Sequence, residues 1–381
     1  MKPILITLAL ALAALPLLAD AGNTALLLPL ENLSANEQAD KLLTVLLTKA
    51  MQSRGWQVIP PERAEGVLEE NRVRYFDSFD APTREKLLAS AEASTLVSGT
   101  IYVWRDGENA AVGLSMRIMA KDGHVLWGDV VALTASDTEG LLGVGRAQAV
   151  QQVAAHAVAR LCRSMPRPGE TRGLVHGPSK RFWRRGPPTF RSIALAEGQH
   201  RRVAILPFDT ASHDRIAPRV VADLLAIRLG ATGMFDVVDP AALRAAARAA
   251  GLRTFSFIGS SELGRLAKPL DTALFLRGSI YKWNDVPARS SNVQPEAQIE
   301  MSLVDVATSR ILWNTIHSRS GADYEDFLLL GAVSNAVTLT DRMLSEMINA
   351  EAHTRPKGSA VLREPSISKQ SLQTKGTNPR P

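Results

Sequence analysis

Apolar and polar residues alternate along this 381-residue chain with a few distinct periods, and each period predicts a type of element. The unbroken apolar run at 25–30 is typical of a fully buried strand. Between residues 42 and 50 apolar residues recur at helical spacing, which predicts a helix that Gly55 ends. From residue 112 to 118 every second residue is apolar and a turn follows at 121–123, which predicts an antiparallel hairpin.

The same succession of patterns occurs twice. The stretch Gly-Thr-Ile-Tyr-Val-Trp-Arg-Asp at 99–106 returns as Gly-Ser-Ile-Tyr-Lys-Trp-Asn-Asp at 278–285, 179 residues later. Its alternation predicts a strand with one buried face and places the Trp of each copy on the face opposite the Ile. In the first copy, further elements are expected at 56–59, 61–71, 83–93, 95–104 and 139–162; in the second, the closing helix is expected at 327–348.

These patterns define a fold class and a domain organisation. A crossover between the first two strands implies parallel pairing, whereas the hairpin implies antiparallel pairing. The sequence therefore predicts an α/β (α+β) protein with two repeated mixed-sheet domains, each βαβααβββα with helices packed on the sheet. We expect a signal peptide at 1–21, a first domain at 22–163, a basic Pro/Gly linker at 164–201, a second domain at 202–349 and a disordered basic tail at 350–381.

The start of the chain indicates where in the cell the protein is located. Lys2, an apolar run from 4 to 18 and an Ala-Asp-Ala stretch before Gly22 form the three regions of a secretory signal peptide. The run is shorter than the ~20 residues that span a bilayer as a helix. No cysteine that could accept a lipid lies near the expected cleavage point, so we expect a periplasmic protein that is not lipidated. The single cysteine, Cys162, is expected in the core; a reactive thiol or an intermolecular bridge is the alternative.

The basic charge lies outside the two copies. The chain carries a net charge of +6, yet residues 163–202 alone hold ten Lys or Arg against two Glu. Residues 350–381 hold six against two. The expected domains are therefore mildly acidic, and any basic contact surface is expected in the connecting segments.

Four stretches of the second copy resemble a known family. They are Val-Ala-Ile-Leu-Pro-Phe-Asp at 203–209, Val-Ala-Asp-Leu-Leu at 221–225, Gly-Met-Phe-Asp-Val-Val-Asp at 233–239 and Gly-Ser-Ile-Tyr at 278–281. Together they resemble the α/β domain shared by the curli secretion protein CsgG, the penicillin-binding-protein activator LpoB and the amino-terminal part of TolB. The first copy resembles it more weakly. The resemblance implies a periplasmic protein of the bacterial envelope that works by binding other proteins, sometimes in rings, without catalysis.

The chain departs from this family in two respects. CsgG and LpoB are lipoproteins, and this chain has no lipid-accepting cysteine at the expected cleavage point. CsgG-like pores also need long amphipathic hairpins, whereas the loops at 106–111 and 286–295 are too short to supply strand pairs of ~10 residues each. A pore is therefore not expected.

The sequence offers little catalytic chemistry. Its seven His residues form no HExxH or HxxxH pattern, and it has no Cys pair, nucleophile elbow or phosphate loop. We therefore expect no catalytic, cofactor-binding or metal-binding residues, and no cofactor. Two acids recur between the copies, Glu31 with Asp209 and Asp106 with Asp285. Paired carboxylates can act as acid and base, but acids beyond strand ends usually make turns and helix caps, and we favour that interpretation.

Aromatic and basic residues supply the remaining candidates for binding. Trp104 and Trp283 could be exposed platforms for a sugar or a partner, although core packing is favoured. The partner-binding candidates are basic residues interleaved with aromatic ones: Lys180, Arg181, Phe182, Trp183, Arg184 and Arg185. Such a segment could bind an acidic protein surface or an anionic membrane surface, or could be a solvated spacer. Secretion argues against nucleic acid as the partner.

The resulting hypothesis is a periplasmic, non-enzymatic adaptor or scaffold in envelope biogenesis, secretion or regulation of a cell-wall synthase. Its partners would be other envelope proteins, with self-association and peripheral contact with an anionic membrane as further expectations. The alternative is a periplasmic hydrolase or carbohydrate-active protein that uses the repeated acids and Trp residues.

Overall fold

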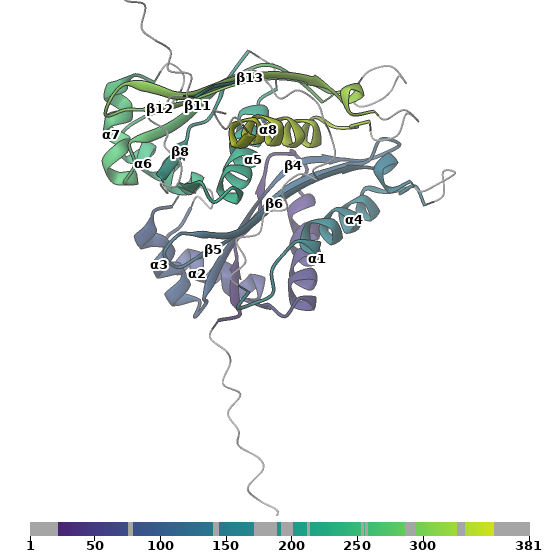
Figure 1. Ribbon diagram of the computed structural model, residues 1–381. Helices are drawn as coiled ribbons and strands as arrows, with labels where there is room; N and C mark the ends of the chain where they lie inside the picture. Colours follow the sequence, from purple (N-terminus) through teal and green to yellow (C-terminus); the bar gives the residue numbers. More distant parts are fainter. Residues whose placement is uncertain are drawn as a thin grey trace, which may run out of the picture.

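The computed structural model describes residues 22–74, 79–139, 145–170, 189–191, 201–211, 214–252, 255, 258–285, 294–325 and 332–353 (Figure 1). The expected signal peptide lies outside these residues, as does most of the expected tail. Within the described part of the chain, no helix is long and apolar enough to cross a membrane.

The first unit is built around a six-stranded sheet, here called sheet A. Its elements are β1 (Thr24–Leu27), β2 (Glu31–Asn32), α1 (Ala39–Ser53), β3 (Gln57–Val58), α2 (Pro61–Glu70), α3 (Ala81–Ser90), β4 (Thr95–Arg105), β5 (Ala111–Ala120), β6 (Val125–Thr134), the 3-10 turn η1 (Ala135–Thr138) and α4 (Val150–Arg163). The strand order is β3-β1-β4-β5-β6, and β2 pairs with β4. Strands β3, β1 and β4 are parallel, whereas β4, β5 and β6 are antiparallel.

The second unit repeats this plan around a seven-stranded sheet, here called sheet B. Its elements are β7 (Thr189–Arg191), β8 (Arg201–Ile205), β9 (Asp209–Thr210), α5 (Ala217–Ala231), β10 (Phe235–Val237), α6 (Pro240–Ala249), α7 (Ser260–Leu270), β11 (Leu274–Asn284), β12 (Glu296–Asp305), β13 (Arg310–Ser320), the 3-10 turn η3 (Gly321–Tyr324) and α8 (Ala336–His353). The order is β10-β8-β11-β12-β13-β7, with β9 paired to β11. The extra strand β7 comes from the connector at 164–201 and is antiparallel to β13.

The predicted fold class is confirmed, but the closing helices are shorter at their starts than expected. Helix α4 begins at Val150 rather than at residue 139, and α8 begins at Ala336 rather than at 327. In both units a 3-10 turn follows the last strand instead. In η1 the Thr134 amide and hydroxyl donate to the Asp137 carboxylate at 2.7 and 2.8 Å. Such local side-chain hydrogen bonds compete with continuation as an α-helix.

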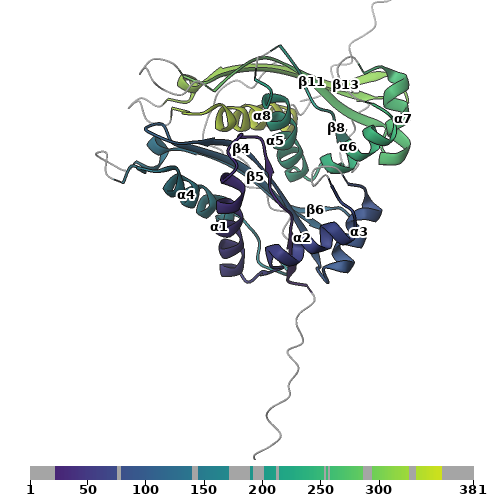
Figure 2. The same cartoon turned by 180° about the vertical axis from the view of Figure 1, so that it is seen from behind.

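The two units stack with helices between their sheets (Figures 1 and 2). Helices α1 and α4 cover one face of sheet A, and α5 and α8 lie between the other face of sheet A and sheet B. Helices α6 and α7 cover the opposite face of sheet B at its β8 and β10 end. Helices α5 and α8 of the second unit therefore pack against both sheet A and sheet B.

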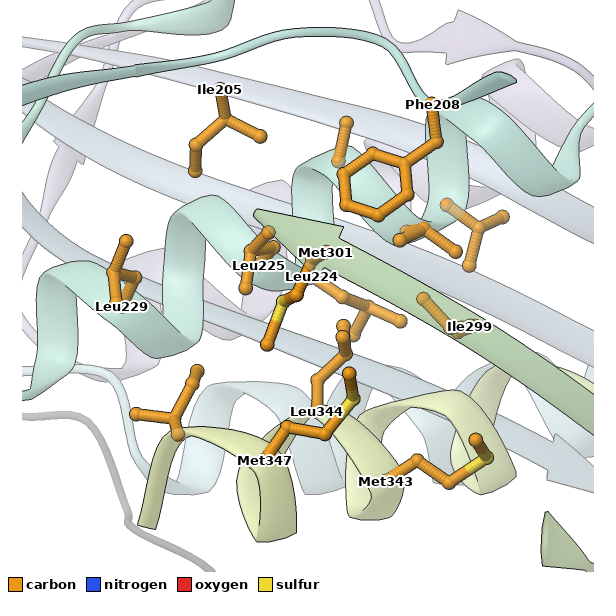
Figure 3. Close-up of a cluster of buried hydrophobic side chains, with 14 of the residues drawn as sticks. Ile205, Phe208, Leu224, Leu225, Leu229, Ile299, Met301, Met343, Leu344 and Met347 are labelled. Atoms are coloured by element: carbon orange, nitrogen blue, oxygen red, sulfur yellow. The ribbon is translucent and has the colours of Figure 1, made fainter. Parts of the chain in front are cut away.

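Helix α5 is accordingly buried on nearly every side. Ten consecutive residues, from 220 to 229, are buried, including Asp223 and Arg228. On the side of α5 that faces sheet B, leucine side chains pack against α8 and β12 (Figure 3). The leucines are Leu224, Leu225 and Leu229, and their neighbours are Met343, Leu344 and Met347 of α8 and Ile299 and Met301 of β12. A helix that is apolar all round is expected where protein surrounds it.

The first glycine of each repeated stretch has a packing role. A Cβ at Gly99 would lie 2.8 Å from the Ser115 carbonyl oxygen, and one at Gly278 would collide with the Phe208 ring and the Glu300 carbonyl. Only glycine lets the neighbouring backbone approach this closely. The repeated Gly therefore belongs to the fold of each unit.

Candidate protein-interaction surface

A one-residue bulge in the repeated strand decides which side chains reach solvent. The pairing of β4 with β5 shifts between Ile101 and Val103, and that of β11 with β12 shifts between Ile280 and Lys282. A bulge leaves one residue unpaired, and a one-residue slip moves the following side chains to the other face. The Ile and Trp of each repeat therefore share one face, and the Tyr lies on the other.

The expectation that Trp and Ile lie on opposite faces is wrong for this reason. Ile280 and Trp283 both belong to the core between sheet B and its helices, and Ile101 and Trp104 both contribute to the core beneath α1 and α4. Trp283 is buried and donates through Nε1 to the Thr340 hydroxyl at 2.9 Å. Core packing of the Trp residues is confirmed, and the Tyr is the aromatic residue that distinguishes the two copies.

In the first unit, Tyr102 is buried where α5 crosses sheet A. Its hydroxyl lies 2.7 Å from the Ser115 hydroxyl and donates to Asp223 Oδ2 at 3.0 Å. Asp223 also accepts from Arg219 Nε at 2.8 Å, and its Oδ1 lies 3.8 Å from Arg117 Nη1. Burial acts to raise the pKa of the Asp223 carboxyl, but the nearby guanidinium groups outweigh it and hold that pKa below its ordinary value. One carboxylate thus joins the two units.

Further ion pairs follow α5 along the same interface. Arg219 pairs with Glu31 of β2 in the first unit. At the other end of α5, Arg228 donates to Asp129 of β6 at 3.3 Å and to Asp341 of α8 at 2.8 Å. Paired charges of this kind tolerate burial because each has its counter-ion within hydrogen-bond distance. The contact between the units is therefore a charge-paired interface.

The equivalent face of sheet B is open. Tyr281, which occupies the place of Tyr102, is 47% exposed, and Ile311 and Ile316 of β13 are 46% and 38% exposed. Among the described residues, no helix covers this end of the sheet as α5 and α8 cover sheet A. We call the surface formed by Tyr281, Glu300, Ser302, Ile311, Asn314 and Ile316 the open face. An aromatic and two aliphatic side chains among polar ones are typical of a surface that binds protein.

The polar groups of the open face hold it in a defined arrangement. The Tyr281 hydroxyl donates to Glu300 Oε2 at 2.5 Å, and this bond raises the pKa of Tyr281. Asn314 Nδ2 donates to the Ser302 hydroxyl at 2.7 Å and to Glu300 Oε1 at 3.3 Å. These cross-strand hydrogen bonds fix the side chains before any partner binds, which lowers the entropy cost of binding.

The structure describes only some of the residues that the sequence pattern marks as candidates. The basic segment Lys180, Arg181, Phe182, Trp183, Arg184 and Arg185 lies outside the described residues, so its partner-binding role stays a prediction. Of the repeated acids, Asp285 accepts from the Ala336 amide at 3.0 Å, as a helix cap does, and from Arg105 at 3.2 Å. Glu31 instead joins the units, which the cap interpretation did not anticipate.

The cysteine and the possible metal ligands form no reactive site in the part of the chain that the structure describes. Cys162 is buried in the core beneath α4, and burial raises the pKa of its thiol to about 12. Of the residues that the structure describes, no group of three His, Cys, Asp or Glu could hold a metal ion.

The match to a known family lies mainly in the second unit. Residues 186–318, about a third of the chain, match the family model of the peptidoglycan-synthase activator LpoB. The match runs through β7 and into β13, so it includes the open face. No curated protein matches the chain.

Several solved structures are similar to part of the chain. The PelC dodecamer from Paraburkholderia phytofirmans is 14% identical, with 43% of this chain and 94% of PelC covered and a TM-score of 0.31. Lipoprotein GNA1162 from Neisseria meningitidis is 15% identical, with coverages of 38% and 99% and a TM-score of 0.29. The LpoB carboxy-terminal domain from Escherichia coli is 18% identical, with coverages of 33% and 87% and a TM-score of 0.25.

Sequence reasoning missed the open face, although a signal for it was present. Residues 296–304 alternate between half-buried and buried positions, whereas 111–119 are buried throughout. In the sequence the first set has Gln298, Glu300 and Ser302 between apolar residues, and the second has Gly113, Ser115 and Arg117. Strict alternation with charged residues indicates a sheet with one solvated face. The polar residues at 298–302 are therefore a sequence signal for a solvated face on sheet B, but they do not identify what covers sheet A.

Proposed function

We propose that this protein is a periplasmic, non-enzymatic adaptor that binds envelope proteins, and that a peptidoglycan synthase is the client it regulates. The observation that carries the proposal is the match of residues 186–318 to the model of a synthase activator. The open face within that match supports it, because a protein that activates another must present a contact surface. The basic segment Lys180–Arg185, which directly precedes the match, is proposed as a second contact with an acidic partner or an anionic membrane.

The first unit supports the second in this proposal. Its sheet is covered by α5 and α8, so its Tyr102 face is unavailable to a client. In return it buries Asp223 and Arg228, which would otherwise be charged groups on a solvent-facing helix. The second unit thereby keeps its core helices in place and its open face outward.

The test combines the mature chain with a purified peptidoglycan synthase from the same organism and measures binding together with glycan polymerisation and cross-linking. We expect the chain to bind and to raise the rate. Replacing Tyr281 and Ile316 together with Asp should weaken binding at least about tenfold, which corresponds to ~1.4 kcal/mol. A matched control with Glu65→Lys and Glu69→Lys changes exposed residues of α2, away from the open face, and should bind as the parent does. If the parent chain neither binds nor stimulates any synthase of the organism, the proposal is wrong.

A further inference from the structure

A crevice of about 230 Å³ lies where an edge strand of each sheet meets the end of α5. The start of β6 and Arg117 of β5 form the wall from the first unit, and the end of α5 together with β10 forms the wall from the second. We call this space the inter-unit crevice. It lies on the helix side of sheet B, whereas the open face lies on the other side of that sheet. The crevice is therefore separate from the surface proposed for the client.

Most of the crevice wall is apolar. Val125 of β6, Ile227 of α5 and Val237 of β10 are among the residues that line it, and Val125, which is 39% exposed, marks its mouth. Gly128 and Gly230 keep the space open, because neither fills it with a side chain. An apolar cavity of ~150 Å³ can hold a benzene ring, so this crevice has room for a ring or a short alkyl chain with a polar end.

Arg117 is the charged residue that lies deepest in this wall. Its side chain is 8% exposed, and its Nη1 lies 3.8 Å from Asp223 Oδ1, which is too far for a hydrogen bond. Nη1 has no hydrogen-bond partner among the described residues. A guanidinium has five N–H donors, and a buried donor without an acceptor costs free energy. Arg117 can therefore donate to an acceptor that enters the crevice.

The matching pair in the second unit shows that this arrangement is particular to the first. Arg117 lies opposite Gly128 across β5 and β6, and a Cβ at Gly128 would lie 3.2 Å from Arg117 Cγ. Ser302 and Asn314 take these two places in β12 and β13, and their side chains form a hydrogen bond of 2.7 Å. In the second unit the neighbouring strand thus supplies a polar partner. In the first unit it supplies a glycine, which leaves space beside the guanidinium.

The charges at the mouth determine which way round a ligand would lie. Asp236 is 33% exposed and lies between two basic groups, with His124 Nδ1 at 3.6 Å and Arg202 Nη1 at 3.2 Å. The basic groups at the mouth therefore already face a carboxylate. A carboxylate on a ligand would be repelled by Asp236 at the mouth and attracted by Arg117 at the inner end.

We propose that the inter-unit crevice binds a ligand that combines an apolar group with one carboxylate. The apolar group lies between β6 and α5, and the carboxylate accepts hydrogen bonds from Arg117 at the inner end. Two sources supply this chemistry: a free aliphatic or aromatic acid, and the terminal carboxylate of a polypeptide that ends in an apolar residue. Because such a ligand contacts both units, its binding favours the arrangement in which they are docked. Binding here is independent of what the open face recognises.

The experiment titrates the mature chain with 3-phenylpropionate and with 3-phenylpropanol, which has the same ring and chain without the charge. Calorimetry measures the affinity, and thermal unfolding measures the stabilisation that a ligand of the folded state provides. The acid should bind saturably and raise Tm. The alcohol should bind at least about tenfold more weakly, because it cannot accept a charge-assisted hydrogen bond from Arg117.

A short peptide distinguishes the two sources of the ligand. The peptide Gly-Gly-Phe with a free carboxylate is compared with 3-phenylpropionate and with its own C-terminal amide. Tighter binding of the peptide acid than of 3-phenylpropionate indicates a chain end as the ligand, and weaker binding indicates a free acid. In either case the amide should bind at least about tenfold more weakly than the peptide acid.

Three variants locate the binding in the crevice. Gly230→Leu should abolish it, because a Cβ there lies 3.7 Å from Val237 Cγ2, at ordinary contact distance, and the rest of the side chain enters the space. Gly264→Leu is the matched control, since Gly264 is an exposed glycine of α7 with open space around an added Cβ. This control should bind the acid as the parent does. Arg117→Met should make the affinities of the acid and the alcohol equal.

The test stays decisive if Arg117→Met fails to fold, because the two ligands are compared on the parent chain and Gly230→Leu alters only the crevice wall. Three results would each overturn the proposal: no binding of the acid at up to about 10 mM, equal binding of the alcohol to the parent, or unchanged binding to Gly230→Leu. Water alone then occupies the crevice. Stimulation of a synthase is measured separately, so a failure of this site leaves the adaptor function standing, and the converse also holds.

Discussion

Tyr102 and Tyr281 occupy the same position of the same repeated strand and differ in everything that surrounds them. Tyr102 is 1% exposed and donates to a buried carboxylate of the other unit, whereas Tyr281 is 47% exposed and donates to a neighbour on its own sheet. The local backbone, including the bulge, is the same in both. The comparison shows that the strand supplies the aromatic side chain and that the packing of the units determines whether it is buried between them or exposed on the open face.

The largest expected effect comes from removing the Asp223 carboxylate, which joins the two units. Asp223→Ala removes a buried counter-ion that Arg219 and Arg117 share, so the free energy of unfolding should fall by about 3–5 kcal/mol. Val45 provides the matched control, because it has the same place in the 15-residue helix α1 that Asp223 has in the 15-residue helix α5. Val45→Ala removes an exposed side chain and should change stability by less than about 0.5 kcal/mol. Urea denaturation of both variants measures the two values. Equal losses would show that the Asp223 carboxylate adds nothing to the stability of the chain.

The paired tyrosines give a smaller effect. Tyr102→Phe removes a buried donor to Asp223 and should cost about 1–3 kcal/mol of unfolding free energy. Tyr281→Phe removes an exposed donor and should stay within about 0.5 kcal/mol. The same denaturation experiment compares the two variants, and an effect of Tyr281→Phe as large as that of Tyr102→Phe would contradict the assignment of the open face.

The pH dependence of the interface gives the smallest effect. The pKa of Asp223 in the folded chain lies below its ordinary value of 3.8, because Arg219 and Arg117 outweigh the effect of burial. Its ionised form therefore contributes stability above pH 3.8, and that contribution is lost as the pH falls through the folded-state pKa. The difference in unfolding free energy between the parent and Asp223→Asn should be constant at neutral pH and should shrink in the acid range. A difference that grows on acidification would reverse the sign and show that burial dominates.

The sequence by itself determined the repeated unit. The apolar run at 25–30, the alternation at 112–118 and the two copies of Gly-x-Ile-Tyr-x-Trp depend on local geometry, because strand and helix periods impose their pattern on each segment separately. The sequence also predicted that each sheet has both parallel and antiparallel strand pairs, because hairpins and crossovers follow from the order of elements along the chain. The late starts of α4 and α8 escaped it, because the capping boxes of Thr134 with Asp137 and of Ser320 with Asp323 form 3-10 turns in segments where a helix was expected or was about to begin.

Only the tertiary structure decided which faces are covered. Whether Tyr102 or Tyr281 reaches solvent depends on where α5 docks, and docking joins residues such as Glu31 and Arg219 that lie far apart in the chain. Their pairing has no period along the sequence, because it is set by the relative placement of two folded units. The repeated strand therefore contributes a buried tyrosine in one copy and an exposed tyrosine in the other.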